Sequence, residues 1–342
     1  MTKLEWIALS NVIAGRSNKL VDFKANKDRF LENIVKEDKF KKALEQAEKL
    51  ENSGAFSIYS QEDEAYPKVL FELDDPPACL YVKGSVPTDD CVAMVGSRTS
   101  TPLGLSLARS FGHDLSKAGL VVVSGLADGI DQASQLGALD AKGKTVSVLG
   151  EGFDVLNNHK KKLVEQIIVD GAVISEYPPT FPAANWTYPM RNRIIAALSR
   201  ATLVIEAPES SGALITAKFA LDLGREVLAT PGTPGVKSFV GCNKLIKDGA
   251  KLVDCVEDVL DVYGIKLHEK QAEQMSDVEK AIFEYCDQPR LLDGIADHLE
   301  MAASAVMCYL TVMNLRGLIS KAPGGFYVKA SFSNAKAGKN RR

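Results

Sequence analysis

Four small-residue loops in this chain have the composition of phosphate-binding turns. Each follows a short apolar run, contains glycine or serine, and precedes a stretch with helical periodicity. The loops span Gly96–Pro102, Ser124–Asp131, Glu206–Gly212 and Thr230–Gly235. Backbone N–H groups at glycine can approach a phosphate closely, and a helix N-terminus adds about half a positive charge. Several such loops at one edge of a fold predict a ligand rich in phosphate.

Basic and amide side chains in or beside these loops are candidates for contact with phosphate. Arg98 directly follows an apolar run, so its guanidinium can bind a phosphate through two hydrogen bonds or stack on a base. Arg191 and Arg193 flank Asn192 at the start of a predicted helix, and Lys160 begins a run of lysines. The full set of candidate binding residues is Ser97, Arg98, Gly125, Ala127, Gly129, Lys160, Arg191, Asn192, Arg193 and Gly212.

Each candidate also has a purely structural alternative. Arg98 could pair with Asp128 or Glu206, and the two arginines beside Asn192 could form ion pairs that fix their own loop. Asn192 could equally cap its helix. The lysine run could be a solvated face, and the glycines could serve only tight turns and helix–sheet packing. The sequence leaves these alternatives open.

No residue pattern indicates catalysis. The first loop lacks the G-x-G-x-x-G spacing of dinucleotide-binding turns, and no Walker A sequence occurs in the chain. The histidines show neither metal-ligand spacing nor an obvious serine or cysteine partner; they are His113, His159, His268 and His298. We therefore expect no catalytic residue, no metal and no cofactor, and ordinary NAD or ATP chemistry is disfavoured.

Composition narrows the class of protein. The 342 residues carry a formal net charge of −3, which excludes a uniformly basic nucleic-acid binder, so any phosphate binding must come from a local patch. The six cysteines include no C-x-x-C pair, which favours reduced thiols. Because the sequence shows neither a secretory signal nor a long apolar run, we expect a cytoplasmic protein that does not bind membranes.

The elements that must position these loops alternate along the central part of the chain. Helical periodicity over 103–117, 130–141 and 213–223 separates short, nearly continuous apolar runs, which is typical of strands buried on both faces. The predicted strands are Cys91–Val95, Leu120–Val123, Thr145–Leu149, Ala172–Ile174, Thr202–Ile205 and Glu226–Ala229. This alternation predicts an α/β fold with an open, largely parallel sheet whose loops gather at the carboxyl ends of the strands.

Two smaller modules flank this core. Residues 1–55 predict a helical module that Gly54 ends, and Leu80–Gly84 predicts one extended strand before the core. After a polar linker over 264–275, three helical patterns and a Gly-rich hairpin over 276–330 suggest a winged helix-turn-helix.

The start of the third helical pattern in this module lacks cations. The stretch Met301–Val306, where a DNA reader carries basic or amide groups, has no cation. This favours packing or partner binding over weak duplex contact through Lys321, Lys329 or the tail. We expect residues 331–342 to form a basic disordered tail.

Several motifs occur in a fixed order between residues 56 and 262. The main ones are Gly96-Ser97-Arg98, Ser124-Gly125-x-Ala127-x-Gly129-Ile130-Asp131, Tyr188-Pro189-x-Arg191-Asn192-Arg193 and Ser211-Gly212-x-Leu214-Ile215-Thr216. This ordered set resembles the DprA (Smf) family of DNA-processing proteins. The chain departs from the family at Asp128, where a basic residue is frequent, and at Ser134-Gln135, where Ala-His is usual.

The resemblance implies an extended Rossmann-like domain over 56–263, a SAM-like helical domain over 1–55 and a winged helix over 276–330. It further implies a non-enzymatic protein that binds and protects single-stranded DNA, forms a homodimer, and helps load the RecA recombinase during natural transformation and homologous recombination. Nothing in the sequence selects the dimer interface, although helices over 213–223 or 243–248 are possible.

Two other functions compete with this interpretation. The first is a Rossmann-like nucleotide enzyme resembling the LOG-type phosphoribohydrolases, although the Pro-Gly-Gly-x-Gly-Thr loop of that family is replaced here by Glu209–Leu214. The second is a dimeric scaffold that does not bind DNA, which Asp128 and the cation-poor C-terminal module would suit.

Overall fold

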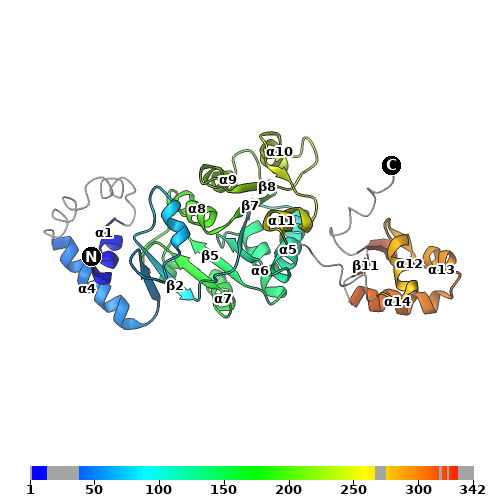
Figure 1. Cartoon of the computed structure of the whole chain (residues 1–342), viewed down its shortest axis with the longest axis horizontal. Helices are drawn as coiled ribbons and strands as arrows, with labels where there is room; N and C mark the ends of the chain where they lie inside the picture. The colour runs from blue at the N-terminus through cyan, green and yellow to red at the C-terminus, as the bar shows by residue number, and fades with distance from the viewer. Residues whose placement is uncertain (1, 14–37, 266–274, 316–317, 322, 330–342) are drawn as a thin grey trace. The chain divides into compact units, whose positions relative to one another are not determined.

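The computed structural model describes residues 2–13, 38–265, 275–315, 318–321 and 323–329. The chain divides into two compact units, Met1–Val253 and Asp254–Arg342, and each is described here by itself (Figure 1). The tail predicted over 331–342 and most of the linker predicted over 264–275 lie outside the described residues.

A nine-stranded sheet forms the centre of the first unit, with the strand order β1-β2-β6-β5-β4-β3-β7-β8-β9. The strands from β6 to β9 along this order, which include β5, β4, β3, β7 and β8, all pair in parallel with their neighbours. At the other edge, β2 pairs antiparallel with β6, and β1 pairs antiparallel with β2. Their bounds are β1 Ser57–Ser60, β2 Cys79–Gly84, β3 Cys91–Gly96, β4 Val121–Ser124, β5 Thr145–Leu149, β6 Ala172–Ser175, β7 Ala201–Ile205, β8 Glu226–Ala229 and β9 Lys251–Leu252. The predicted α/β fold with a largely parallel sheet is confirmed; the short strands β1 and β9 were not predicted.

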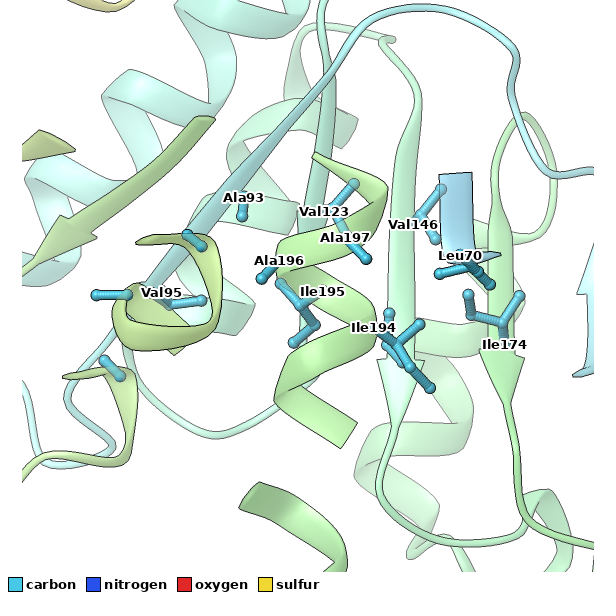
Figure 2. Close-up of a cluster of buried hydrophobic side chains, with 14 of the residues drawn as sticks. Leu70, Ala93, Val95, Val123, Val146, Ile174, Ile194, Ile195, Ala196 and Ala197 are labelled. Carbon is cyan, nitrogen blue, oxygen red and sulfur yellow. The ribbon is translucent and has the colours of Figure 1, made fainter. Parts of the chain in front are cut away.

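Helices connect the parallel strands and cover the sheet. They are α5 Pro102–Lys117, α6 Ile130–Asp140, α7 Asn158–Ile167, α8 Thr187–Leu198, α9 Gly212–Asp222 and α10 Val240–Lys247, with short 3₁₀ segments η1 Lys68–Glu72, η2 Phe153–Val155 and η3 Lys237–Phe239. Figure 2 shows Ile194 and Ile195 of α8 packed among strand residues that include Ala93, Val123 and Val146. No helix among the described residues is both long and apolar enough to cross a membrane.

Polar caps determine where the helices around the sheet begin. The Thr101 hydroxyl accepts a hydrogen bond from Gly104 N at 3.1 Å, and the Asn157 side chain accepts one from Lys160 N at 2.9 Å. Ser211 caps α9 in the same way. Because a capping side chain satisfies a helix N–H that would otherwise lack a partner, each helix starts directly after its loop.

The N-terminal helices pack on one end of this sheet within the first unit. These helices are α1 Lys3–Ile13 and α4 Asp38–Ser53, and the chain leaves α4 at Gly54 with a positive φ of 62°. The Tyr81 hydroxyl of β2 donates a hydrogen bond to Asn11 Oδ1 at 2.8 Å. Trp6, Phe40 and Phe153 belong to one buried apolar cluster, so these helices share a core with the sheet.

The second unit contains helices and a small antiparallel sheet. The helices are α11 Val256–Tyr263, α12 Asp277–Tyr285, α13 Leu292–Leu299 and α14 Ala303–Leu315; the strands are β10 Arg290–Leu291, β11 Ile319–Lys321 and β12 Phe326–Lys329, with η4 Pro323–Gly325 between the last two. The strand order is β10-β12-β11. Helices α12, α13 and α14 and the hairpin of β11 and β12 match the predicted pattern over 276–330, whereas helix α11 and strand β10 were not predicted. Helix α14 carries no charged side chain.

Helix α14 has buried and exposed apolar residues, and substituting one of each tests how this helix packs in the second unit. We expect Leu310→Ala to destabilise it by about 2–5 kcal/mol, whereas Val312→Ala on the same helix changes stability by less than about 0.5 kcal/mol. The reason is that Leu310 is 0% exposed and Val312 is 48% exposed. Hydrogen exchange of residues 277–315 and denaturant unfolding measure both variants. Equal effects would contradict the burial assigned to this helix.

Candidate phosphate-binding pocket

A pocket of about 430 Å³ lies at the carboxyl ends of β3 and β7. These strands are neighbours in the sheet, and the chain leaves β3 toward β4 on the other side. The pocket therefore lies where the strand order reverses, which is the usual ligand site of open α/β sheets. Six of the ten predicted binding residues line it: Ser97, Arg98, Ala127, Arg191, Asn192 and Gly212.

Arg98 is the exposed cation of this pocket. Its guanidinium carbon lies 4.8 Å from the centre of the Tyr188 ring, and Tyr188 also lines the pocket. The ring attracts the cation through its electron-rich face and limits the positions that the side chain can take. Among the described residues, Arg98 takes part in no ion pair. Its donors are therefore available for an anionic ligand.

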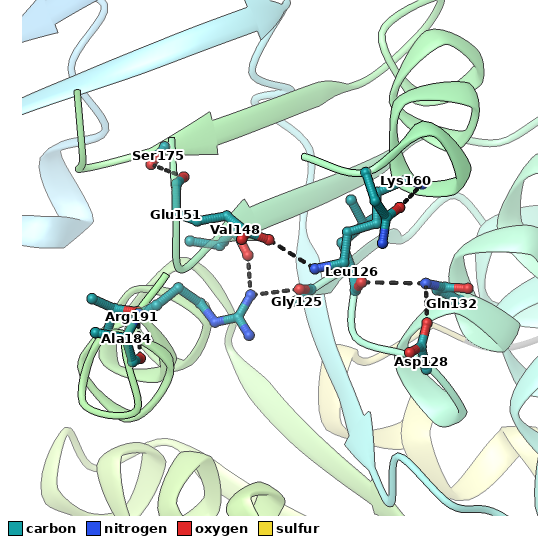
Figure 3. Close-up of polar contacts among 12 residues, drawn as sticks. Gly125, Leu126, Asp128, Gln132, Val148, Glu151, Lys160, Ser175, Ala184 and Arg191 are labelled. Carbon is teal, nitrogen blue, oxygen red and sulfur yellow. Dashed lines mark hydrogen bonds and ion pairs between the residues drawn. The ribbon is translucent and has the colours of Figure 1, made fainter. Parts of the chain in front are cut away.

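The two carboxylates that could have paired with Arg98 bind elsewhere. Asp128 accepts a hydrogen bond from Gln132 Nε2 at 3.0 Å (Figure 3). Glu206 accepts hydrogen bonds from the backbone N–H and the hydroxyl of Thr101 at 2.9 and 2.7 Å. The structural alternative for Arg98 thus has no support in these contacts.

Arg191 lines the pocket, but its hydrogen bonds point into the protein. The residue is 3% exposed, and its Nη1 donates to the carbonyl oxygens of Gly125, at 2.6 Å, and of Val148 (Figure 3). A side chain at Gly125 would overlap with this guanidinium, which explains the glycine. Arg191 therefore joins the ends of β4 and β5 to α8 and adds positive charge behind the pocket.

Asp131 anchors the loop that follows β4. Its Oδ2 accepts a hydrogen bond from Gly125 N at 3.0 Å at the start of α6. Burial raises the pKa of the Asp131 carboxyl, and the nearby Arg191 guanidinium opposes part of that rise. The side chain is thus held by backbone and by a buried cation, in a position suited to support rather than to acid–base work.

The start of α9 forms the opposite wall. Asn192 Nδ2 donates to the carbonyl oxygen of Gly212 at 3.2 Å, which links α8 to α9. A Cβ atom at Gly212 would meet nothing within 4 Å, so packing does not require this glycine. At Gly129, by contrast, a Cβ atom would overlap with the backbone of Ser97, and φ is 88°. Gly129 is therefore needed by the fold, and Gly212 leaves open space beside the pocket.

Four predicted residues lie outside the lining of the pocket: Gly125, Gly129, Lys160 and Arg193. Arg193 is 3% exposed and pairs with Asp75 at 3.2 Å and Glu176 at 2.7 Å. Lys160 pairs with Glu151 at 2.8 Å. For these two cations the structure shows the ion pairs of the structural alternative, because their charges are already neutralised away from the pocket.

The departures from the family pattern have partners inside the protein. Ser134 and Gln135 are buried in α6, and Gln135 Nε2 donates to the Ser147 hydroxyl at 2.5 Å. Asp128 is held by Gln132, which faces His159 at 3.2 Å. These residues therefore form contacts between α6 and its neighbours, and none of the three departures lines the pocket.

Several polar or aromatic residues that line the pocket are not among the ten predicted binding residues. Among them are Tyr188, Ser211 and Thr216. Gly212 and Thr216 are four residues apart in α9, and such positions share one face of a helix. That spacing could have indicated Thr216, whereas the contact between Tyr188 and Arg98 joins residues from distant parts of the chain.

The central part of the chain matches the model of a family described as DNA recombination-mediator protein A, over residues 57–264. Protein Smf of Synechocystis sp. is 41% identical over 199 residues, which make up 56% of this chain and 50% of that protein. The chain thus spans half of the length of this relative.

Two solved structures resemble the fold. DNA processing protein A from Streptococcus pneumoniae has a TM-score of 0.64 and 33% identity, and the match covers 78% of this chain and 100% of that chain. DNA processing protein A from Helicobacter pylori, described for its unique single-stranded DNA binding mode, has a TM-score of 0.55 and 26% identity over 63% of this chain and 99% of that chain.

Alanine should affect stability differently at Gly125 and at Gly212. We expect Gly125→Ala to lower the free energy of unfolding by about 1–3 kcal/mol, because the new methyl group overlaps with the buried Arg191 guanidinium. Gly212→Ala, the matched control, should stay within about 0.5 kcal/mol of the original protein. Denaturant unfolding of both variants measures this difference, and a large loss at Gly212 would show that the space beside it is filled.

Proposed function

Because the chain belongs to the DNA recombination-mediator protein A family, we propose that it binds single-stranded DNA in the pocket between the ends of β3 and β7. The observation that carries this proposal is Arg98, an exposed guanidinium braced on Tyr188 beside the start of α9. The similar protein from Helicobacter pylori, described for single-stranded DNA binding, supports it.

The chemistry of the pocket suits a phosphodiester chain. Arg98 offers donors in a planar fork, and the N-terminus of α9 adds partial positive charge at Gly212. Tyr188 provides an aromatic surface of the kind on which bases stack. None of these groups reads a base edge, so binding would be largely independent of DNA sequence.

A binding role, rather than catalysis, agrees with the residues around the pocket. Among the described lining residues there is no histidine, cysteine or lysine, and Asp131 is held by Gly125 N. This supports a protein that binds DNA without cleaving it, in contrast to a nucleotide hydrolase, which needs a free acid or base.

The family resemblance extends this proposal to the protein partners of the chain. We propose that the DNA-bound chain is a homodimer that loads the RecA recombinase in the cytoplasm, as the family resemblance implies. We also propose that residues 276–330, within the second unit, form a winged helix that contacts a protein partner. The uncharged α14 supports this assignment, because duplex binding depends on cations that neutralise phosphates.

Arg98 provides the direct test of the pocket. We expect Arg98→Ala to weaken binding of a labelled single-stranded oligonucleotide by about tenfold, because a charge-assisted contact to phosphate is lost. Fluorescence anisotropy measures the affinity. Arg109→Ala is the matched control, since Arg109 is an exposed cation of α5 already paired with Asp140. Unchanged affinity in Arg98→Ala would contradict the proposed pocket.

Salt dependence tests the proposed recognition of phosphate. Affinity for single strands should fall steeply between about 50 and about 200 mM salt, because bound cations release counterions from DNA. In Arg98→Ala the slope of log affinity against log salt should decrease by about 0.7, the contribution of one phosphate contact on a single strand. Equal affinity at the two salt concentrations would rule out this mechanism.

A further inference from the structure

The start of α5 is occupied by a carboxylate from a different part of the chain. Glu206, directly after β7, is 0% exposed. Its Oε1 accepts a hydrogen bond from Thr101 N at 2.9 Å, and its Oε2 accepts one from the Thr101 hydroxyl at 2.7 Å. Thr101 is the N-cap residue of α5, so the Glu206 carboxylate lies at the positive end of this helix.

The carboxylate is held there without a cation. Among the described residues, no ion pair involves Glu206. Its charge is therefore stabilised by the Thr101 donors and by the dipole of α5, as a bound anion would be. The surrounding chain also makes room for it, because a Cβ atom at Gly104 would overlap with Glu206 Oε2.

The backbone conformation of Glu206 indicates that its surroundings hold this residue in place. Its φ is 51°, in the left-handed region that a non-glycine residue rarely adopts. Such a conformation persists only where the surrounding contacts stabilise it. Here it accompanies a side chain that points from the end of β7 to the start of the neighbouring α5.

The place of this carboxylate corresponds to a phosphate site in related sheets. In open α/β sheets, a nucleotide phosphate lies at the N-terminus of the helix that follows a strand at the switch point. Strand β3 lies at the switch point of this sheet, and α5 is the helix that follows it. The carboxylate of Glu206 thus fills the place that a phosphate would take.

We propose that Glu206 is a specificity-determining residue, an internal anion that keeps nucleotide phosphates away from the start of α5. Like charges repel, and the carboxylate already uses the donors of Thr101. The start of α9, where Gly212 leaves open space, then remains for an external anion. This inference goes beyond the proposed function and does not depend on it.

Replacement of Glu206 tests the inference. Full-length Glu206→Ala and Glu206→Gln are titrated with inorganic phosphate and with AMP by calorimetry, at an ionic strength kept constant with chloride. We expect Glu206→Ala to bind phosphate at least about fivefold more tightly than the original protein, because charge and volume are both removed at a helix start. Glu206→Gln, the matched control, removes the charge but keeps the volume, so its gain should be smaller than that of Glu206→Ala. No gain in Glu206→Ala would overturn the proposal.

Folding of the variants provides the second measurement. If Glu206→Ala is unfolded without an added anion, recovery of the fold with phosphate but not with chloride supports the proposal, and no recovery overturns it. Gly104→Ala should destabilise the original protein and cost less in the Glu206→Ala background, because the overlapping carboxylate is gone. Equal costs would contradict the assigned position of Glu206. The proposed function is tested separately, by fluorescence anisotropy of single-stranded DNA binding to the original protein.

Discussion

The buried guanidinium of Arg191 fixes the geometry of the pocket, because a cation removed from water must be surrounded by acceptors. Here those acceptors are carbonyl oxygens at the ends of β4 and β5, on Gly125 and Val148. The requirement draws two strand ends and the start of α8 together. It also explains why Gly125 has no side chain and why Asp131, a buried carboxylate, lies close to the same guanidinium. The loops that line the pocket are therefore held in place by buried charges whose hydrogen bonds point into the protein.

Charges at the carboxyl edge of the sheet divide into supporting and accessible groups. Arg191 and Arg193 are buried and engaged by backbone oxygens or carboxylates, whereas Arg98 is exposed and rests on an aromatic ring. The helix starts divide in the same way, because Glu206 fills that of α5 while α9 begins at open space. The pocket thus has one exposed cation, held on an aromatic ring, and one helix start beside open space, and the surrounding polar groups keep these two in place.

Much of the fold follows from local pattern in the sequence. The parallel strands are nearly continuous apolar runs, and the helices between them begin at capping residues such as Thr101 and Ser211, so their positions could be predicted closely. The strands β1, β9 and β10 were not predicted, because these short segments mix polar and apolar residues and lack the nearly continuous apolar run of the predicted core strands. They exist because longer neighbouring strands supply their hydrogen-bond partners.

The sequence by itself determined the α/β class and the loops that form the site, because strand and helix periodicity and capping chemistry act over a few residues. It also selected Arg98, Arg191 and Arg193 as candidates for phosphate contact, but it could not separate their roles. Only the tertiary structure decided that Arg193 meets Asp75 and Glu176, that Arg191 meets backbone carbonyls, and that Arg98 stays exposed. The reason is physical: whether a cation is free depends on burial and on partners brought from distant parts of the chain, and neither is encoded in the residues beside it.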